Sequence, residues 1–223
     1  MSARSFAVST GSALLLLGGA PLASGADEAL AAEAQARLGE AVDEIGAILA
    51  DENASPDEKR AGIEYRLRRW LDLAFISRAA LGKGAEQFSR EQYAEFAQEF
   101  GRYVVGLYVR RIAREASADF QIVGSTWNEK TGTVIVHTLG GKPLVAMTAE
   151  FYRKAPDTAK VDYRLRKRRG EWRIVSISIS GVDVVRLFRE QFDAVLRSRE
   201  PDEVIGQLRA HNARLEASNP FDS

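Results

Sequence analysis

Residues 160–185 read KVDYRLRKRRGEWRIVSISISGVDVV, and this stretch decides the fold. Val161, Tyr163 and Leu165 alternate with charged neighbours, which is the period of a β-strand with one buried face. A turn around Gly170 separates them from a second run of strand-forming residues, so the stretch predicts an antiparallel hairpin. After Gly181 the apolar period becomes helical, so the hairpin is followed by a helix.

The same strand pattern extends upstream of this hairpin. The predicted strands, separated by short turns, are Phe120 to Trp127, Thr133 to Leu139, Leu144 to Arg153, Lys160 to Arg168 and Trp172 to Ile179. Short loops between successive strands favour an antiparallel meander. The sequence therefore predicts a single curved, mostly antiparallel sheet of about five strands.

Helical patterns precede and follow these strands in the sequence. Apolar residues recur every three or four positions in 27–50, in a segment running to Trp70, in 71–81 and in a longer helix opened by Ser89. Ser55 and Glu58 form a capping box at the start of the second helix. Downstream, Asp183 caps one helix and Pro201 opens the last. The fold class is α+β, with N-terminal and C-terminal helices covering the sheet.

The N-terminus has the features of a signal peptide. Arg4 precedes a short apolar run interrupted by glycines, and small residues suit cleavage after Ala26. An uncleaved anchor or a buried helix is the alternative interpretation. Residues 1–26 are thus predicted to be removed, which leaves 27–223 as one domain. No cysteine is present, so neither lipidation at a cleavage-site cysteine nor a disulfide is possible.

The residues that carry chemistry in enzymes are sparse. No cysteine nucleophile, metal-binding histidine pair, nucleophile elbow or phosphate loop occurs. His137 and His211 are interpreted as structural or exposed, so no catalytic residue and no metal ligand is predicted. Basic and acidic residues number 31 each, so no overall charge favours nucleic acid. The local basic run in 160–173 is either a solvated sheet face or a surface attracting anionic headgroups or an acidic partner.

Several segments, in order, resemble the MlaC (toluene-tolerance) family. They are Val161-Asp162-Tyr163-Arg164-Leu165, Glu171-Trp172-Arg173-Ile174-Val175, Ile179-Ser180-Gly181-Val182-Asp183-Val184-Val185 and Phe188-Arg189-Glu190-Gln191-Phe192. The last helix from Pro201 and the segment Phe75 to Gly82 are also similar to that family. The resemblance extends over nearly the whole chain after the leader.

The resemblance implies an NTF2-like fold that holds phospholipid acyl chains in a cavity between sheet and helices. It implies a periplasmic carrier that needs no cofactor and has phospholipid as cargo. It also implies exchange between an outer-membrane lipoprotein–porin complex and an inner-membrane ABC transporter with an MCE-domain subunit, in a pathway that maintains outer-membrane lipid asymmetry. A carrier with one lipid opening needs no partner copy, so a monomer is expected.

The predicted lipid-binding residues are large apolar or aromatic side chains that should face the space between sheet and helices. They are Phe96, Phe100, Val104, Tyr108, Val145, Met147, Tyr163, Trp172, Phe188 and Phe192. The alternative for each is packing in a closed core without lipid contact.

Three other functions remain possible on the sequence. A related periplasmic carrier could bind a hopanoid instead of a phospholipid. An NTF2-like enzyme could use Asp162 as a base, although alternation along the strand points Asp162 away from Tyr163. An envelope scaffold would bind partners and no lipid.

Overall fold

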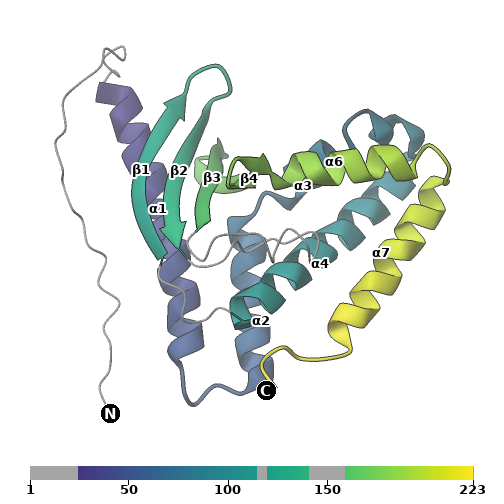
Figure 1. Cartoon of the computed structure of the whole chain (residues 1–223), viewed down its shortest axis with the longest axis horizontal. Coiled ribbons are helices and arrows are strands. Elements are labelled where there is room, and N and C mark those ends of the chain that lie inside the picture. Colours follow the sequence, from purple (N-terminus) through teal and green to yellow (C-terminus); the bar gives the residue numbers. More distant parts are fainter. Residues whose placement is uncertain (1–24, 115–119, 141–158, 223) are drawn as a thin grey trace.

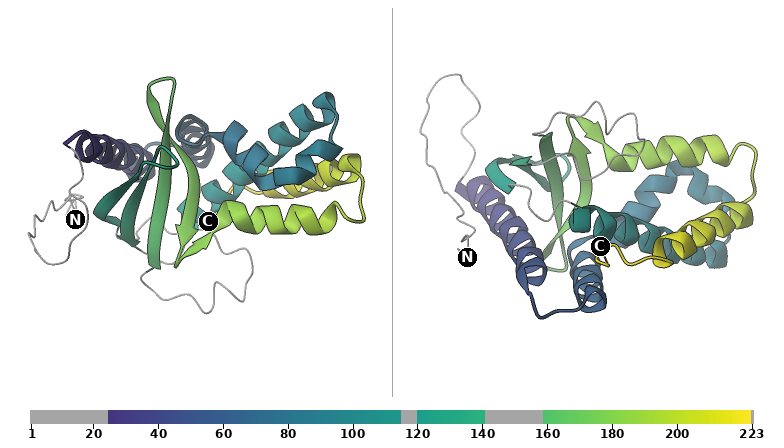
Figure 2. Two further views of the ribbon diagram at one scale, coloured as in Figure 1. Left: turned by 90° about the horizontal axis from the view of Figure 1, so that it is seen from above. Right: turned by 60° about the horizontal axis from the view of Figure 1, so that its bottom comes forward.

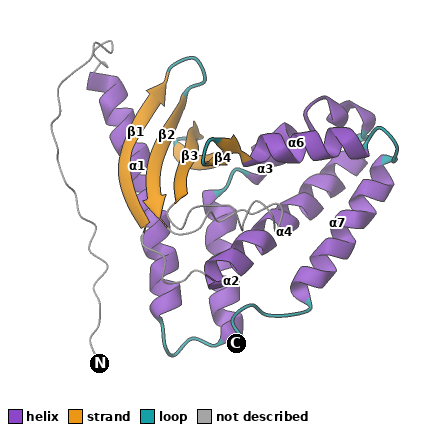
Figure 3. Cartoon of the chain, in the orientation of Figure 1, coloured by secondary structure: helices purple, strands orange, loops and turns teal. Residues whose placement is uncertain are grey.

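The computed structural model describes residues 25–114, 120–140 and 159–222, and its elements run as helices, then a sheet, then helices (Figures 1 and 3). The helices are α1 Gly25–Ala50, α2 Pro56–Trp70, α3 Leu73–Leu81, the 3₁₀ helix η1 Gly82–Gln87, α4 Arg90–Arg114, α6 Val184–Val195 and α7 Pro201–Glu216. The strands are β1 Phe120–Asn128, β2 Thr133–Gly140, β3 Ala159–Arg168, β4 Glu171–Ile179 and β5 Val182–Asp183. This order confirms the predicted α+β class.

One sheet of five antiparallel strands is formed in the order β1-β2-β3-β4-β5. Val136 of β2 lies opposite Tyr163 of β3, which lies opposite Ile177 of β4. Four strands lie where the sequence predicts them, whereas the predicted strand Leu144 to Arg153 falls outside the described residues. Among the described residues the fifth strand is instead β5, a two-residue pairing of Val182 with Ile179 and of Asp183 with Ser178.

Helices cover one face of the curved sheet at two places. α1 packs against β1 and β2, whereas α2, α3 and α6 contact β4. Figure 2 shows α1 beside β1 and β2 at one end of the sheet, and the group of α3, α4, α6 and α7 toward the β4 end. The helical group is held together by contacts of α4 with α7 and of α3 with α6. The apolar core therefore lies between one sheet face and the helices.

The start of α3 departs from the prediction that all of 71–81 is helical, because Leu71 and Asp72 lie outside both helices. Leu71 forms an isolated parallel bridge with Ile174 of β4, and the Asp72 amide donates to the Ile174 carbonyl. The Asp72 side chain then accepts from the Phe75 amide and caps α3. Pairing with the sheet thus interrupts the helical run at a point where periodicity alone continues.

In the part of the chain that the structure describes, no helix combines the length and apolar character needed to cross a membrane. The predicted leader falls almost wholly outside the described residues, so its removal stays a prediction.

Candidate binding site

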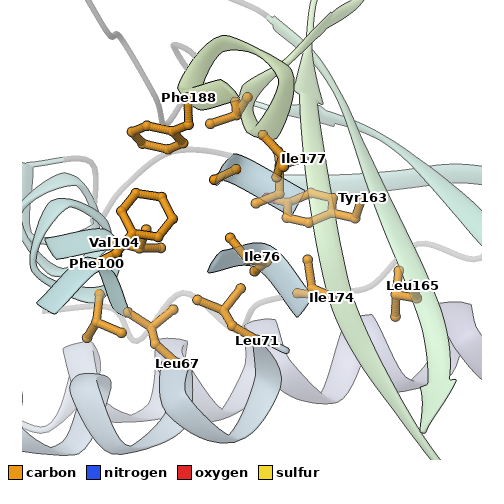
Figure 4. Close-up of a cluster of buried hydrophobic side chains, with 14 of the residues drawn as sticks. Leu67, Leu71, Ile76, Phe100, Val104, Tyr163, Leu165, Ile174, Ile177 and Phe188 are labelled. Atoms are coloured by element: carbon orange, nitrogen blue, oxygen red, sulfur yellow. The ribbon is translucent and has the colours of Figure 1, made fainter. Parts of the chain in front are cut away.

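A group of apolar side chains converges between α4 and the β3–β4 hairpin (Figure 4). We call it the central cluster, and the residues that define it are Leu67, Leu71, Ile76, Phe100, Val104, Tyr163, Leu165, Ile174, Ile177 and Phe188. Every one of them is buried. They come from α2 and the residue after it, α3, α4, β3, β4 and α6, so side chains far apart in sequence share one enclosed region.

Local periodicity explains how α4 contributes to this cluster. Phe96, Phe100 and Val104 are spaced by four residues, which places them on one face of a helix. Phe96 and Phe100 are 0 % exposed, and Val104 is also buried. The face of α4 predicted from sequence is therefore the face that packs inward.

The aromatic rings of α4 and α6 contact one another directly. Phe100 lies 5.0 Å from Phe188 and 5.3 Å from Phe192 between ring centroids, both edge to face. Phe96 lies 5.1 Å from Phe192 and 5.4 Å from Phe88, a residue that the sequence prediction missed. Edge-to-face contacts of this kind add about 0.5–1.5 kcal/mol each beyond area burial. Four predicted residues are thus brought together, and their rings pack on one another where α4 meets α6.

Tyr108 and Tyr163 place hydroxyl groups next to this apolar region. Burial raises the pKa of the Tyr163 hydroxyl far above its ordinary value. Burial first, and the neighbouring Tyr163 second, do the same to the pKa of Tyr108, although part of the Tyr108 side chain reaches the surface. Both phenols are therefore neutral across the physiological range.

Trp172 lies elsewhere, against α1. Its indole nitrogen donates to the Glu33 carboxylate at 3.1 Å, and Lys167 donates to the same oxygen at 2.6 Å. The hydrogen bond from Lys167, and then that from Trp172, lower the pKa of Glu33. Val145 and Met147 fall outside the described residues. Of the ten predicted residues, the structure places seven on the α4–α6–β3 side and Trp172 apart from them.

The polar face of the sheet bears on the enzyme alternative. Asp162 Oδ1 lies 2.7 Å from His137 Nδ1, and His137 Nε2 lies 3.0 Å from the Thr126 hydroxyl. Such a chain has the order of a hydrolase relay, but Thr126 is exposed and the other two are half-buried on the outer face, whereas such relays work where water is excluded. As alternation predicts, Asp162 points away from Tyr163. These three side chains connect neighbouring strands.

The clefts lined by described residues include two that lie apart from the predicted site. One, of about 290 Å³, lies between η1 and α6 and is lined by Lys83, Gly84, Gln87, Asp193, Leu196 and Arg197. The other, of about 20 Å³, lies among α2, α4 and α7. No group of three or more acidic or histidine side chains that could hold a metal ion occurs among the described residues. The central cluster offers apolar side chains that can pack against an apolar ligand.

Together, the sheet-and-helix fold and its central cluster define a small α+β protein with an apolar core region between one sheet face and its helices. A family model described as MlaC protein matches residues 39–210. The chain belongs to the MlaC family.

The fold is also that of a solved structure. A phospholipid-binding protein from Ralstonia solanacearum, solved in complex with a phospholipid, superposes with a TM-score of 0.66 at 18 % sequence identity. The match covers 82 % of this chain and 99 % of that one. No curated protein matches the sequence significantly.

Proposed function

We propose that this protein is a periplasmic carrier that binds phospholipid acyl chains between α4 and the β3–β4 hairpin. The observation that carries the proposal is the central cluster, in which Val104 of α4 faces the apolar residues of β3 and β4. Membership in the MlaC family, and the phospholipid bound by the Ralstonia protein of the same fold, support this choice of cargo.

The physical need for such a site follows from the cost of exposing acyl chains. A buried methylene contributes about 0.8 kcal/mol, so moving a lipid chain through water unshielded costs on the order of 10 kcal/mol. A carrier lowers this cost by enclosing the chains, and it can leave the polar headgroup in water. The neutral phenols of Tyr108 and Tyr163 would give the site hydrogen-bonding groups without a buried charge.

Not all predicted residues serve this role equally. Phe96 is surrounded by the rings of Phe88, Phe100 and Phe192, so we assign it to the support of the site. We place the acyl chains nearer the sheet, beside Val104, Tyr108 and Tyr163. Phe188 of α6 would cover them.

The wider pathway is part of the same proposal. The predicted signal peptide supports export to the periplasm. Within that compartment the protein would exchange lipid with an outer-membrane lipoprotein–porin complex and with an inner-membrane MCE-type ABC transporter, and so maintain lipid asymmetry. No covalent chemistry is required of the chain, since transporter ATP hydrolysis would supply any energy needed. The hopanoid carrier, the NTF2-like enzyme and the envelope scaffold are the alternatives.

Native mass spectrometry of protein purified from the periplasm, followed by organic extraction and lipid identification, distinguishes these alternatives. We expect a stoichiometric two-chain phospholipid. A hopanoid would assign the protein to the other carrier type. Protein that contains no lipid and also takes none from vesicles would refute carriage and favour the scaffold.

A further inference from the structure

The β3–β4 hairpin concentrates positive charge in a chain that has none overall. Basic and acidic residues are equal in number across the whole sequence. Residues 160–173, in contrast, contain seven lysines or arginines and two acidic residues. The excess is therefore a property of this hairpin.

Most of these cations already have partners within the protein. Lys167 pairs with Glu33, and Arg168 pairs with Asp72 at 2.6 Å. The remaining pairs are Arg164 with Asp183 at 3.4 Å, Arg173 with Glu171 at 2.9 Å and Lys160 with Asp162 at 3.9 Å. Within the described residues, no carboxylate pairs with Arg166 or Arg169. These two arginines can thus bind an anion without breaking an existing pair.

The position of Arg166 is unfavourable for an arginine without an external partner. It lies directly opposite Arg173 across the two strands, and like charges in that relation destabilise a sheet. Arg164 and Arg168 follow two residues away on the same face. An anion bound at this point would relieve the repulsion.

An exposed aromatic ring adjoins this charge. The Arg166 guanidinium lies 5.7 Å from the ring centroid of Phe75, and Phe75 is 37 % exposed. Phe75 belongs to α3, which Leu71 and Asp72 hold beside β4. Arginines next to an accessible apolar ring are typical of surfaces that contact the headgroup region of a lipid layer.

We infer that the outer face of the β3–β4 hairpin docks the protein on an anionic lipid surface, where Arg166 and Arg169 bind lipid phosphates and Phe75 contacts the interface. Arginine presents a planar fork that binds phosphate through two hydrogen bonds. Arg166, Arg168 and Arg169 are exposed, and such a spread of exposed cations suits a lipid layer. The inference goes beyond the proposed carriage of lipid, because it concerns the opposite face of the sheet.

The test is flotation of the mature protein with vesicles of phosphatidylcholine, with and without phosphatidylglycerol. We expect binding only to the anionic vesicles, and weaker binding as salt is raised. Each basic residue near such a surface changes affinity about fivefold, so Arg166→Gln with Arg169→Gln should weaken binding roughly 25-fold. Arg169→Gln alone should weaken vesicle binding about fivefold. Because Arg169 lies at the exposed turn, this single variant should fold normally even if the double variant does not.

The matched control replaces two exposed arginines beyond α6, Arg197→Gln with Arg199→Gln, which changes the net charge equally. Binding of this control should stay within about twofold of the unsubstituted protein, since its residues lie away from the hairpin. Failure of the unsubstituted protein to bind anionic vesicles at low salt, even if an acidic protein binds the hairpin, overturns the inference. An equal loss in the control also overturns it. Neither result depends on whether lipid is extracted from the protein, so carriage and docking fail separately.

Discussion

At the scale of single residues, the two enclosed phenols determine how the free energy of unfolding changes at alkaline pH. Below about pH 10, tyrosine is neutral in both the folded and the unfolded chain, so Tyr108 and Tyr163 cause no change in stability with pH. Above it, the unfolded chain loses these protons while the folded protein retains them, because burial raises both pKa values. The free energy of unfolding therefore falls as pH rises past 10.

We predict that Tyr108 and Tyr163 ionise only when the protein unfolds. A spectrophotometric titration followed together with circular dichroism checks this, since the chain has six tyrosines to count. Ionisation of all six before any loss of structure would contradict the enclosed position of the two hydroxyls.

Gly84 allows η1 to approach α6 closely. A Cβ added at Gly84 would lie 2.7 Å from Leu196 Cδ1, and Leu196 is buried. We expect Gly84→Ala to reduce the free energy of unfolding by about 1–3 kcal/mol, measured by urea denaturation. Gly206→Ala in α7, where nothing lies within 4 Å, should instead stabilise by about 0.5–1 kcal/mol. The same sign in both variants would rule out the close contact as the cause.

At the scale of elements, local signals in the sequence were sufficient for most boundaries. The capping box of α2 is formed, with the Glu58 carboxylate accepting from the Ser55 amide at 2.8 Å and the Glu58 amide donating to the Ser55 hydroxyl at 3.3 Å. The Asp183 cap of α6 is likewise formed. Both depend on residues three apart, and such contacts can be read from a window of sequence.

Contacts between distant segments could not be predicted in this way. The break at Leu71 results from pairing with Ile174, more than one hundred residues later, and helical periodicity contains no sign of it. Trp172 is predicted to line the lipid site, but its hydrogen-bond partner Glu33 lies on α1, away from α4 and α6. Alternation determines the face on which a side chain lies; the element that covers this face depends on the complete fold.

The packing of α7 on α4 includes a buried polar contact. The Asn212 amide nitrogen donates to the Glu99 carboxylate at 2.7 Å and to the Glu99 carbonyl at 3.0 Å. Asn212→Ala should cost about 2–3 kcal/mol in urea unfolding, because the buried Glu99 loses one of its donors, while Arg102 still donates to its carboxylate. Asn219→Ala removes a similar but exposed hydrogen bond to Asp57 and should change stability by less than about 0.5 kcal/mol. Equal effects would show that Asn212 does not stabilise this contact.

At the scale of the whole molecule, the central cluster joins the sheet to the helical group. Its members come from helices that precede the sheet in the sequence, from the strands themselves and from α6, which follows them, so no single segment of sequence reveals the cluster. The sequence did predict the inward faces of α4, β3 and α6, since each follows from periodicity. Periodicity did not distinguish the roles of Phe96 and Val104. Phe96 packs among other rings and Val104 faces the sheet, and this difference depends on how α6 packs against α4.

Two adjacent valines on α4 allow the most direct test of where lipid binds. Val104 points into the central cluster, whereas Val105 is equally buried but lines the small cleft toward α7. Replacing either by phenylalanine overfills its surroundings and should cost about 1–3 kcal/mol. The measurement is the ratio of extracted lipid to protein for each variant purified from the periplasm. We predict a several-fold lower ratio for Val104→Phe and an unchanged ratio for Val105→Phe. Equal lipid content in the two variants, or a loss only in Val105→Phe, would contradict binding between α4 and the sheet.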